Sequence, residues 1–217
     1  MRRISNKGYC LIVAGVALVS IVIALIVRTT IKEFTFEDIA TEEYLYDPYI
    51  DVEYSNGAFQ EVTPDFNVVD ESEYILKVQV TGSRELLEGT VKTQIEILDV
   101  MKGTLAEKAG DLYEPIDISM MGYHNSISSF GGYNLLKEGK EYIICVTYSP
   151  KLQAFMYVTP MLGKFPKSYD ENDYLVIQKT DDKESQLKYQ DYNEYEQLFE
   201  TQEMKELYFK TYESLWK

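Results

Sequence analysis

The longest apolar stretch of the chain runs from Tyr9 to Val27 and contains neither a charged residue nor a proline. As an α-helix this stretch would be about 28 Å long, close to the hydrocarbon thickness of a lipid bilayer. A helix also satisfies all of its backbone hydrogen bonds internally, which a segment surrounded by lipid requires. The pattern therefore predicts a transmembrane helix over residues 9–27, after a tail of residues 1–8.

The charges beside this stretch predict its orientation. Arg2, Arg3 and Lys7 precede it without any acidic residue, and positively charged flanks stay on the cytoplasmic side. We therefore expect a single-pass protein of the cell membrane, with a cytoplasmic N-terminus and an extracytoplasmic C-terminal domain. A cleaved signal peptide is the alternative, but the stretch is long for one and no small-x-small cleavage site follows it.

Strict alternation of apolar and polar residues predicts two β-strands, over residues 73–81 and 90–100. Their apolar faces contain Tyr74, Leu76, Val78, Val80, Val91, Thr93, Ile95 and Ile97. Further strands are predicted over residues 111–120, 141–148, 154–159 and 174–178. The unbroken apolar run at residues 143–146 indicates a strand that is buried on both faces.

A β-hairpin is predicted before these strands. Apolar and polar residues alternate up to Asn56-Gly57, a dipeptide that favours a two-residue type I′ turn. This turn would place Tyr54 opposite Phe59 as an aromatic cross-strand pair. The residues between the membrane helix and the hairpin, 28–48, are expected to form a juxtamembrane stalk.

The C-terminal segment of residues 181–217 changes to a helical period. Asn193 is the predicted N-cap of a helix that ends at Trp216. Two apolar stripes follow the helical spacing, one formed by Met204, Leu207, Tyr208, Thr211 and Leu215 and the other by Tyr195, Leu198 and Phe199. We expect this helix to pack on the preceding strands.

Five or six strands joined by tight turns predict a mainly β domain over residues 49–180. A parallel βαβ arrangement would need crossover helices, and no helical pattern lies between the strands. The pattern therefore predicts an antiparallel sheet that is closed into a barrel or a sandwich.

Four stretches carry a resemblance to known proteins: YILKVQVTG from Tyr74, TQIEILDVMKG from Thr93, LYEP from Leu112 and GGYNLLKEGKEY from Gly131. Over residues 50–165 the chain resembles small, uncharacterised membrane-anchored or lipid-anchored proteins of Gram-positive bacteria. The strand order also resembles the OB-type barrel of netrin and tissue-inhibitor-of-metalloproteinase modules. Those modules rely on disulfides, and the inhibitors on an N-terminal cysteine, that this chain lacks. The resemblance implies an envelope location and a small antiparallel OB-like β-barrel, and it implies no activity.

Charge and cysteine content limit the function classes. The chain has 36 acidic and 21 basic residues, and residues 1–32 contain five of the basic residues and no acidic one, so residues 33–217 carry a net charge of −20. Such a domain repels nucleic acid and anionic lipid, whereas it can attract cations or basic peptides. Cys10 lies in the predicted membrane helix and Cys145 in a predicted buried strand, so no disulfide is expected within one chain.

The loop of residues 121–134 contains the residues that we single out for a functional site, Tyr123, His124 and Tyr133. His124 is the only histidine, and serines follow it, but the G-x-S-x-G elbow of many hydrolases is absent. We therefore expect these residues to contribute to binding and not to catalysis. Tyrosine suits this role because it supplies contact area and a hydrogen bond at low entropic cost.

No metal and no cofactor are expected. A single histidine and two cysteines do not make a zinc site. Asp170, Asn172 and Asp173 lack the glycine and glutamate of an EF-hand loop and fit a turn instead. Gly131 and Gly132 lack the Lys-Ser/Thr of a phosphate loop, so they are expected to serve backbone geometry.

These features favour a non-enzymatic, membrane-tethered module of the bacterial cell envelope that binds a protein, a peptide or a cell-wall component. An envelope-acting hydrolase with a carboxylate-based site is one alternative, and an inhibitor or immunity-type module that uses an exposed loop at residues 121–134 is another. A concave acidic pocket with a carboxylate of raised pKa would indicate the hydrolase. A tyrosine-rich exposed patch would indicate the binding module.

Overall fold

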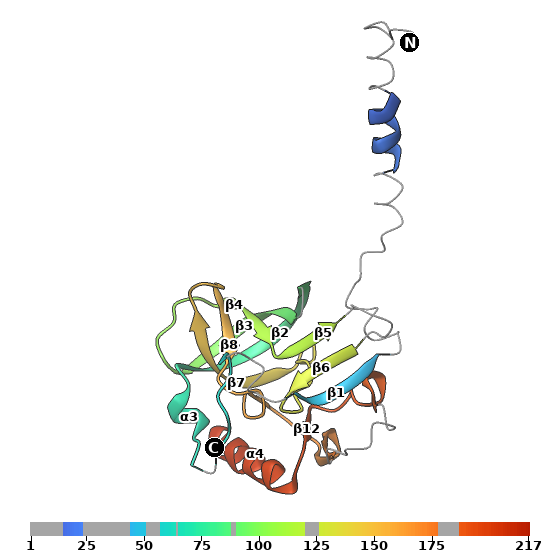
Figure 1. Cartoon of the computed structure of the whole chain (residues 1–217). Helices are drawn as coiled ribbons and strands as arrows, with labels where there is room; N and C mark the ends of the chain where they lie inside the picture. The colour runs from blue at the N-terminus through green and yellow to red at the C-terminus, as the bar shows by residue number, and fades with distance from the viewer. Residues whose placement is uncertain are drawn as a thin grey trace, which may run out of the picture. The chain divides into compact units, whose positions relative to one another are not determined.

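The structure, a computed structural model, describes residues 15–23, 44–50, 57–63, 65–87, 90–119, 126–177 and 187–217. The chain divides into two compact units, Met1–Thr35 and Phe36–Lys217. In the first unit residues 15–23 are helical, and their apolar side chains are exposed. The second unit is mainly β and ends in a helix (Figure 1), which confirms the predicted class.

Among the described residues, no helix combines the length and the apolar character that crossing a bilayer requires. The transmembrane helix predicted over residues 9–27 extends on both sides beyond the described residues 15–23. The tail of residues 1–8 and residues 28–43 of the predicted stalk lie outside the described residues.

The described elements of the second unit follow one another in short steps along the chain. They are β1 (Leu45–Ile50), α3 (Val68–Glu71), β2 (Tyr74–Leu87), β3 (Thr90–Lys102), β4 (Ala109–Glu114), β5 (Ile116–Ser119), β6 (Ser126–Phe130), β7 (Glu141–Ser149), β8 (Ala154–Tyr157), β9 (Lys164–Pro166), η2 (Glu171–Asp173), β10 (Tyr174–Val176), β11 (Leu187–Lys188), η3 (Tyr189–Asp191), β12 (Gln197–Phe199) and α4 (Gln202–Leu215).

Five strands are joined in a closed ring of hydrogen-bonded pairs. The order β2-β3-β4-β8-β7 returns to its start, because β7 pairs with both β8 and β2. Every pair in the ring is antiparallel except β4–β8, which is parallel. β9 pairs with the N-terminal half of β7 and extends the sheet beyond the ring.

Two smaller sheets complete the described strands. One has the order β11-β1-β6-β5, in which β1 and β6 run parallel. The other consists of β10 and β12, which are also parallel. Antiparallel pairs predominate as predicted, but these parallel contacts between distant segments were not expected.

The predicted alternation in β2 and β3 is confirmed. All residues of the two predicted apolar faces are buried except Tyr74, which is half-buried. Their side chains fill the interior of the ring, and this burial is the main favourable term for its formation. The residues between them are half-buried or exposed, apart from Ile75 and the undescribed side chain of residue 82.

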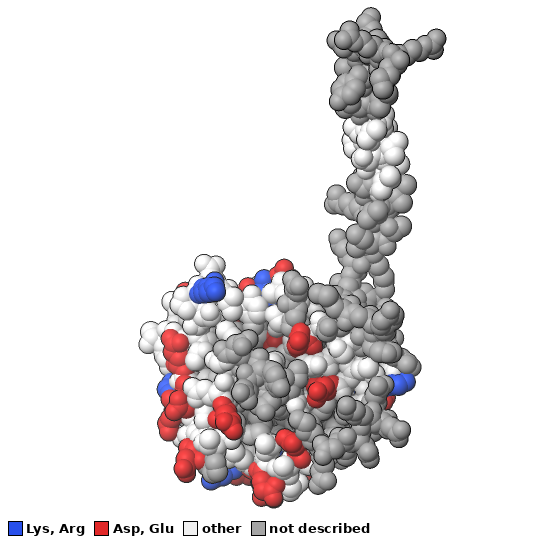
Figure 2. Space-filling view, viewed as in Figure 1, with Lys and Arg blue, Asp and Glu red and all other residues white. Residues whose placement is uncertain are grey.

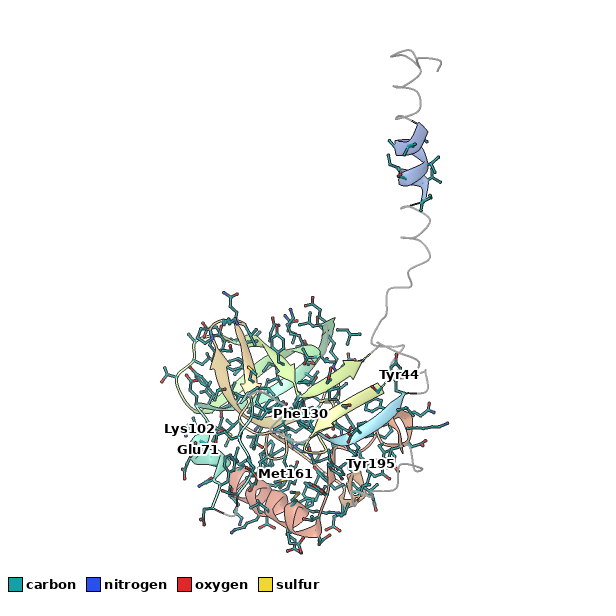
Figure 3. The ribbon with its side chains drawn as sticks, in the orientation of Figure 1. Tyr44, Glu71, Lys102, Phe130, Met161 and Tyr195 are labelled. Atoms are coloured by element: carbon teal, nitrogen blue, oxygen red, sulfur yellow. The ribbon has the colours of Figure 1, made fainter. Side chains whose placement is uncertain are left out.

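Burial of β7 on both faces is also confirmed, and α4 is the reason. Ile144 and Val146 face the ring, whereas Ile143 and Cys145 contact an apolar cluster outside it. That cluster is formed by Val68, Ile75, Ile143, Cys145, Val158, Met161, Leu162, Phe165, Tyr174, Phe199, Tyr208, Tyr212 and Leu215. It joins α4 to the strands, as expected, and Met161 is labelled beside α4 in Figure 3.

The predicted start of the C-terminal helix is wrong. α4 begins after Thr201, whose hydroxyl accepts a hydrogen bond from the backbone N–H of Met204 at 3.3 Å, so Asn193 is not the cap. Leu198 and Phe199 belong to β12 and not to a helical stripe. The reason is tertiary, because β12 pairs with β10 and its backbone cannot form a helix at the same time.

Several other boundaries differ from the prediction. The predicted strand at residues 111–120 is divided at Pro115 into β4 and β5, because proline has no N–H for the ladder. β1 already begins at Leu45, inside the predicted stalk of residues 28–48. The C-terminal segment 181–217, predicted to be helical, also contains β11 and β12.

The predicted hairpin at Asn56-Gly57 is replaced by longer-range contacts. β1 pairs with β6 and β11, and Tyr54 lies outside the described residues. Phe59 instead lies near Phe130, with ring centroids 5.3 Å apart.

A lysine fixes α3 against the ring. Lys102, at the end of β3, donates hydrogen bonds to the backbone oxygens of Val69 and Asp70 at 2.8 and 2.9 Å. Figure 3 labels Lys102 close to Glu71 at the end of α3. The ammonium group thereby satisfies carbonyls that a helix terminus leaves open.

Gly132 provides a test of how β12 is docked. Its φ is +70°, its N–H donates to Pro48 O at 2.7 Å, and its carbonyl accepts from the N–H of Leu198 at 2.9 Å. A Cβ at this position would overlap the Leu198 carbonyl, whereas one at Gly139, with a φ of +74°, meets open space. We expect Gly139→Ala to cost about 1–2 kcal/mol of backbone strain and Gly132→Ala to cost clearly more.

Urea unfolding of the full chain, followed by circular dichroism, checks this pair. Equal costs for Gly132→Ala and Gly139→Ala would contradict the close approach of β12 to residues 131–133.

Candidate functional site

Of the residues predicted for a functional site, the structure describes only Tyr133. Tyr123 and His124 lie outside the described residues. Tyr133 is fully buried, so it forms no part of an exposed binding surface, because its ring and hydroxyl are used inside the fold. The loop of residues 121–134 is also not a continuous exposed loop, because Ser126–Phe130 form β6 and residues 132–134 are buried.

Tyr133 belongs to a set of interior polar side chains that we call the buried polar network. Its members come from β2, β3, β4, β7, β8, β9, the turn after β6 and the residue before β12. They are Arg84, Thr93, Glu114, Tyr133, Asn134, Tyr142, Tyr157, Lys164 and Glu196.

Glu114, the last residue of β4, is one centre of this network. One carboxylate oxygen accepts hydrogen bonds from the Tyr133 hydroxyl at 2.7 Å and the Leu136 N–H at 2.8 Å. The other accepts from the Thr93 hydroxyl and lies 3.7 Å from Nε of Arg84. Donors thus reach both oxygens, which a buried carboxylate requires.

Two tyrosine hydroxyls continue the network from Glu114. The hydroxyls of Tyr133 and Tyr157 are 3.0 Å apart, and their rings pack at 5.2 Å between centroids. Burial, reinforced by the charge of Glu114, raises the pKa of both tyrosines well above their ordinary value. Both hydroxyls therefore stay protonated and act as hydrogen-bonding groups.

Lys164, the first residue of β9, is a fully buried ammonium group. It donates to the backbone oxygen of Asn134 at 2.6 Å and lies 4.6 Å from the centroid of the Tyr133 ring. Its Nζ is also 3.5 Å from Glu196. Burial lowers the pKa of Lys164 to about 8, although Glu196 and Glu114 favour its charged form.

Glu196 is the second centre, directly before β12. Its carboxylate is 2.8 Å from Nζ of Lys140, 3.7 Å from Nζ of Lys137 and 3.3 Å from the Tyr142 hydroxyl. Burial alone would raise the pKa of Glu196, but the lysines, Lys164 first among them, bring it below its ordinary value. The group is thus an engaged carboxylate and not a general acid.

Asn134 links the network to the C-terminal segment. Its amide donates to the backbone oxygens of Tyr192 and Tyr195 at 2.9 and 3.1 Å, and its oxygen accepts from the Tyr46 hydroxyl at 2.9 Å. Tyr195 is labelled in Figure 3. The network therefore joins β1, the ring and the segment that leads into β12 and α4.

This arrangement is suited to holding the fold together. Glu114 and Glu196 are buried, with 1% and 0% exposure, so neither meets a substrate from solvent. Neither is therefore the acid in an open pocket that a carboxylate-based hydrolase needs. Partial burial raises the pKa of Asp117 on β5, but this residue does not line the hollow described below.

The other candidate chemistry of the described residues also has a structural explanation. The hydroxyl of Ser129 is buried and donates to Pro48 O at 3.1 Å. Asp170 accepts from the Asn172 N–H at 2.9 Å and caps η2, which confirms the predicted turn. The thiol of Cys145 is buried, and burial raises its pKa to about 12. Within the described ranges, no group of three or more His, Cys, Asp or Glu residues is placed to hold a metal.

An open hollow of about 550 Å³ lies beside α4. It is lined by Tyr169, Glu171, Gln202, Lys205, Glu206, Phe209, Lys210 and Glu213. We call it the α4 hollow. The spacing of its α4 residues, three or four apart, places them on one helix face, while Tyr208, Tyr212 and Leu215 are buried against the strands.

Aromatic rings contribute to the lining of this hollow. Tyr169 is 40% exposed. Its ring centroid lies 5.1 Å from that of Phe209 and 4.8 Å from that of Tyr212, which it meets edge-on. These contacts fix the ring in place, so the α4 hollow offers an ordered aromatic surface beside charged and amide groups.

Acidic side chains are spread widely over the second unit. Figure 2 shows Asp and Glu scattered across the visible face, with few Lys or Arg among them. This distribution agrees with the net charge of −20 for residues 33–217 and gives the surface a negative potential.

Comparison with protein-family models found no match, and a search among curated proteins found none either.

The sequence contained signals for the network that the motif analysis did not use. Glu114 is in the same alternating phase as Leu112, and Lys164 stands in the mostly apolar run from residue 161 to 166. A charge in an apolar phase indicates a buried, paired group. The α4 hollow had no such signal, since Tyr169 and α4 are brought together only by the fold.

The role of Glu196 can be tested by Glu196→Gln. Loss of its charge leaves the fully buried Lys164 without its contacting carboxylate, so we expect a loss of about 3–5 kcal/mol in the free energy of unfolding. The matched control is Glu194→Gln, whose side chain is exposed and whose change should stay within about 0.5 kcal/mol. Urea unfolding measures both, and similar values for the two variants would show that the network does not stabilise the fold.

Proposed function

We propose that the chain is a membrane-tethered, extracytoplasmic binding module of the bacterial cell envelope and that it performs no chemistry of its own. The observation that carries this proposal is the α4 hollow. It exposes an aromatic ring and charged groups to solvent, while Glu114, Glu196 and Lys164 are engaged with one another and with their neighbours inside the fold.

The module is proposed to be an OB-like β-barrel with a C-terminal helix. The closed ring β2-β3-β4-β8-β7 supports this, since a five-stranded closed sheet is the core of such a barrel. The buried side chains of Leu76, Val78, Ile95 and Leu112 also support it, because the interior of a small barrel is filled by side chains. A filled interior leaves recognition to the outer surface.

The tether is proposed to be the apolar stretch from Tyr9 to Val27. Its length and its basic N-terminal flank support a single span with the N-terminus in the cytoplasm. A tether places the module near the membrane and raises its local concentration there, which increases the avidity of a binding protein without new contacts.

The position of the α4 hollow supports binding more than hydrolysis. Its charged groups stand on the exposed face of a helix and beside the short η2, where water has free access. A carboxylate that acts as a general acid needs an environment that raises its pKa. An ordered tyrosine beside charged groups is instead typical of recognition surfaces.

Site-specific cross-linking in cells tests this function. The full chain carries Gln202→p-benzoylphenylalanine in the α4 hollow and is expressed in Gram-positive cells, with Gln190→p-benzoylphenylalanine as the matched exposed control. We expect illumination to join an envelope component to the first variant and not to the second. Protease added to wall-stripped cells should remove the domain from outside.

No cross-linked product at position 202 would contradict the binding role of the α4 hollow. A domain protected from external protease would contradict the extracytoplasmic location, whatever the cross-linking shows.

A further inference from the structure

We propose that the α4 hollow binds a basic peptide segment, with an Arg or Lys side chain placed over the ring of Tyr169. This inference rests on the proposed binding function and names its ligand class. It is carried by the ordered aromatic ring, the charges around it and the charge of the whole domain.

The ring of Tyr169 is arranged to receive a cation. It is 40% exposed, and its contacts with Phe209 at 5.1 Å and with Tyr212 at 4.8 Å hold it in position. A guanidinium or ammonium group over such a ring is attracted by its quadrupole. Because the ring is already ordered, little entropy is lost when a ligand binds.

The carboxylates around the ring favour the same ligand. Glu171 stands on η2, and Glu206 and Glu213 lie two turns apart on α4. Glu206 meets Gln202 at 3.5 Å, and Glu213 meets the exposed Lys217 at 3.7 Å. Exposed pairs of this kind are worth little, so a ligand cation can replace them.

The lysines of the α4 hollow do not reverse this preference. Nζ of Lys205 donates to the backbone oxygen of Tyr174 at 2.9 Å, which directs part of its hydrogen-bonding capacity into the protein. Lys210 is exposed. Three carboxylates thus stand against two ammonium groups, one of which is already engaged.

Long-range electrostatics point in the same direction. The net charge of −20 on residues 33–217 repels anionic ligands and steers cationic ones toward the surface. A neutral glycan would gain from the tyrosine ring alone and would gain nothing from this charge. A peptide with spaced Arg or Lys residues uses both features.

The test is calorimetric titration of the full chain in uncharged detergent with the capped peptide Gly-Arg-Gly-Arg-Gly. Its citrulline analogue is a neutral match, and chitotetraose represents neutral wall glycan. We expect the Arg peptide to bind about tenfold more tightly than the citrulline peptide and to weaken as salt rises. Chitotetraose should not compete.

Four variants show whether binding occurs in the α4 hollow. Tyr169→Ala should weaken the Arg peptide about fivefold to tenfold, and Tyr169→Phe should retain most of the affinity. Glu206→Gln should weaken it and reduce its dependence on salt. Tyr148→Ala is the control, since Tyr148 is 38% exposed and lies outside the α4 hollow.

Equal affinity for the Arg and citrulline peptides would overturn the inference. So would equal losses in Tyr169→Ala and Tyr148→Ala, which would indicate unspecific attraction to an acidic surface. Binding of chitotetraose that depends on Tyr169 would replace the ligand class and leave the binding function intact. Failure of both ligands would overturn this inference alone, because the cross-linking experiment decides the binding function independently.

Discussion

The buried contact between Lys164 and Glu196 is the interaction on which the arrangement of the second unit depends. Lys164 begins β9, and Glu196 precedes β12, so their contact at 3.5 Å joins the ring to the C-terminal segment. Removing two charges from water costs several kcal/mol per ion. That cost is offset only where each group finds its partners, and here Lys140, Tyr142 and the Asn134 carbonyl supply them. The pair therefore favours one position of β12.

The position of β12 has consequences for the surface. Thr201, two residues after β12, caps α4, so the direction of the helix follows from the docking of the strand. The apolar cluster then holds one face of α4 against β7 and β9. The opposite face, with η2 beside it, becomes the α4 hollow. A buried electrostatic contact thus supports an exposed recognition surface that it does not touch.

Much of the ring was predictable from sequence. The alternation in β2 and β3 and the apolar run in β7 each depend on local pattern, and burial reproduces them. β6, β9 and β12 are short strands that owe their conformation to distant partners, and two of them pair in parallel. No local pattern identifies such strands. The same reason explains why Tyr133, taken as a surface residue from its polar loop, is buried, and why Tyr169 was not singled out.

The central claim is that the polar interior is closed and that its tyrosines act only as buried hydrogen-bonding groups. Burial raises the pKa of tyrosines throughout the fold, among them Tyr46, Tyr133, Tyr157 and Tyr208. Their contribution to stability is fully present below pH 10, where tyrosines of the unfolded chain begin to ionise, and it is lost above that pH. Lys164 has the opposite sign. With a folded pKa of about 8 against an ordinary 10.5, its contribution rises between these values and does not cause alkaline unfolding.

The most direct test is therefore an alkaline titration of the full chain, with tyrosinate absorbance and circular dichroism recorded on the same sample. The account predicts two stages. Exposed tyrosines ionise near pH 10 with the fold intact, and the buried ones ionise only at higher pH, together with a cooperative loss of the β signal. Ionisation of all tyrosines near pH 10 with the β signal unchanged would contradict the closed interior.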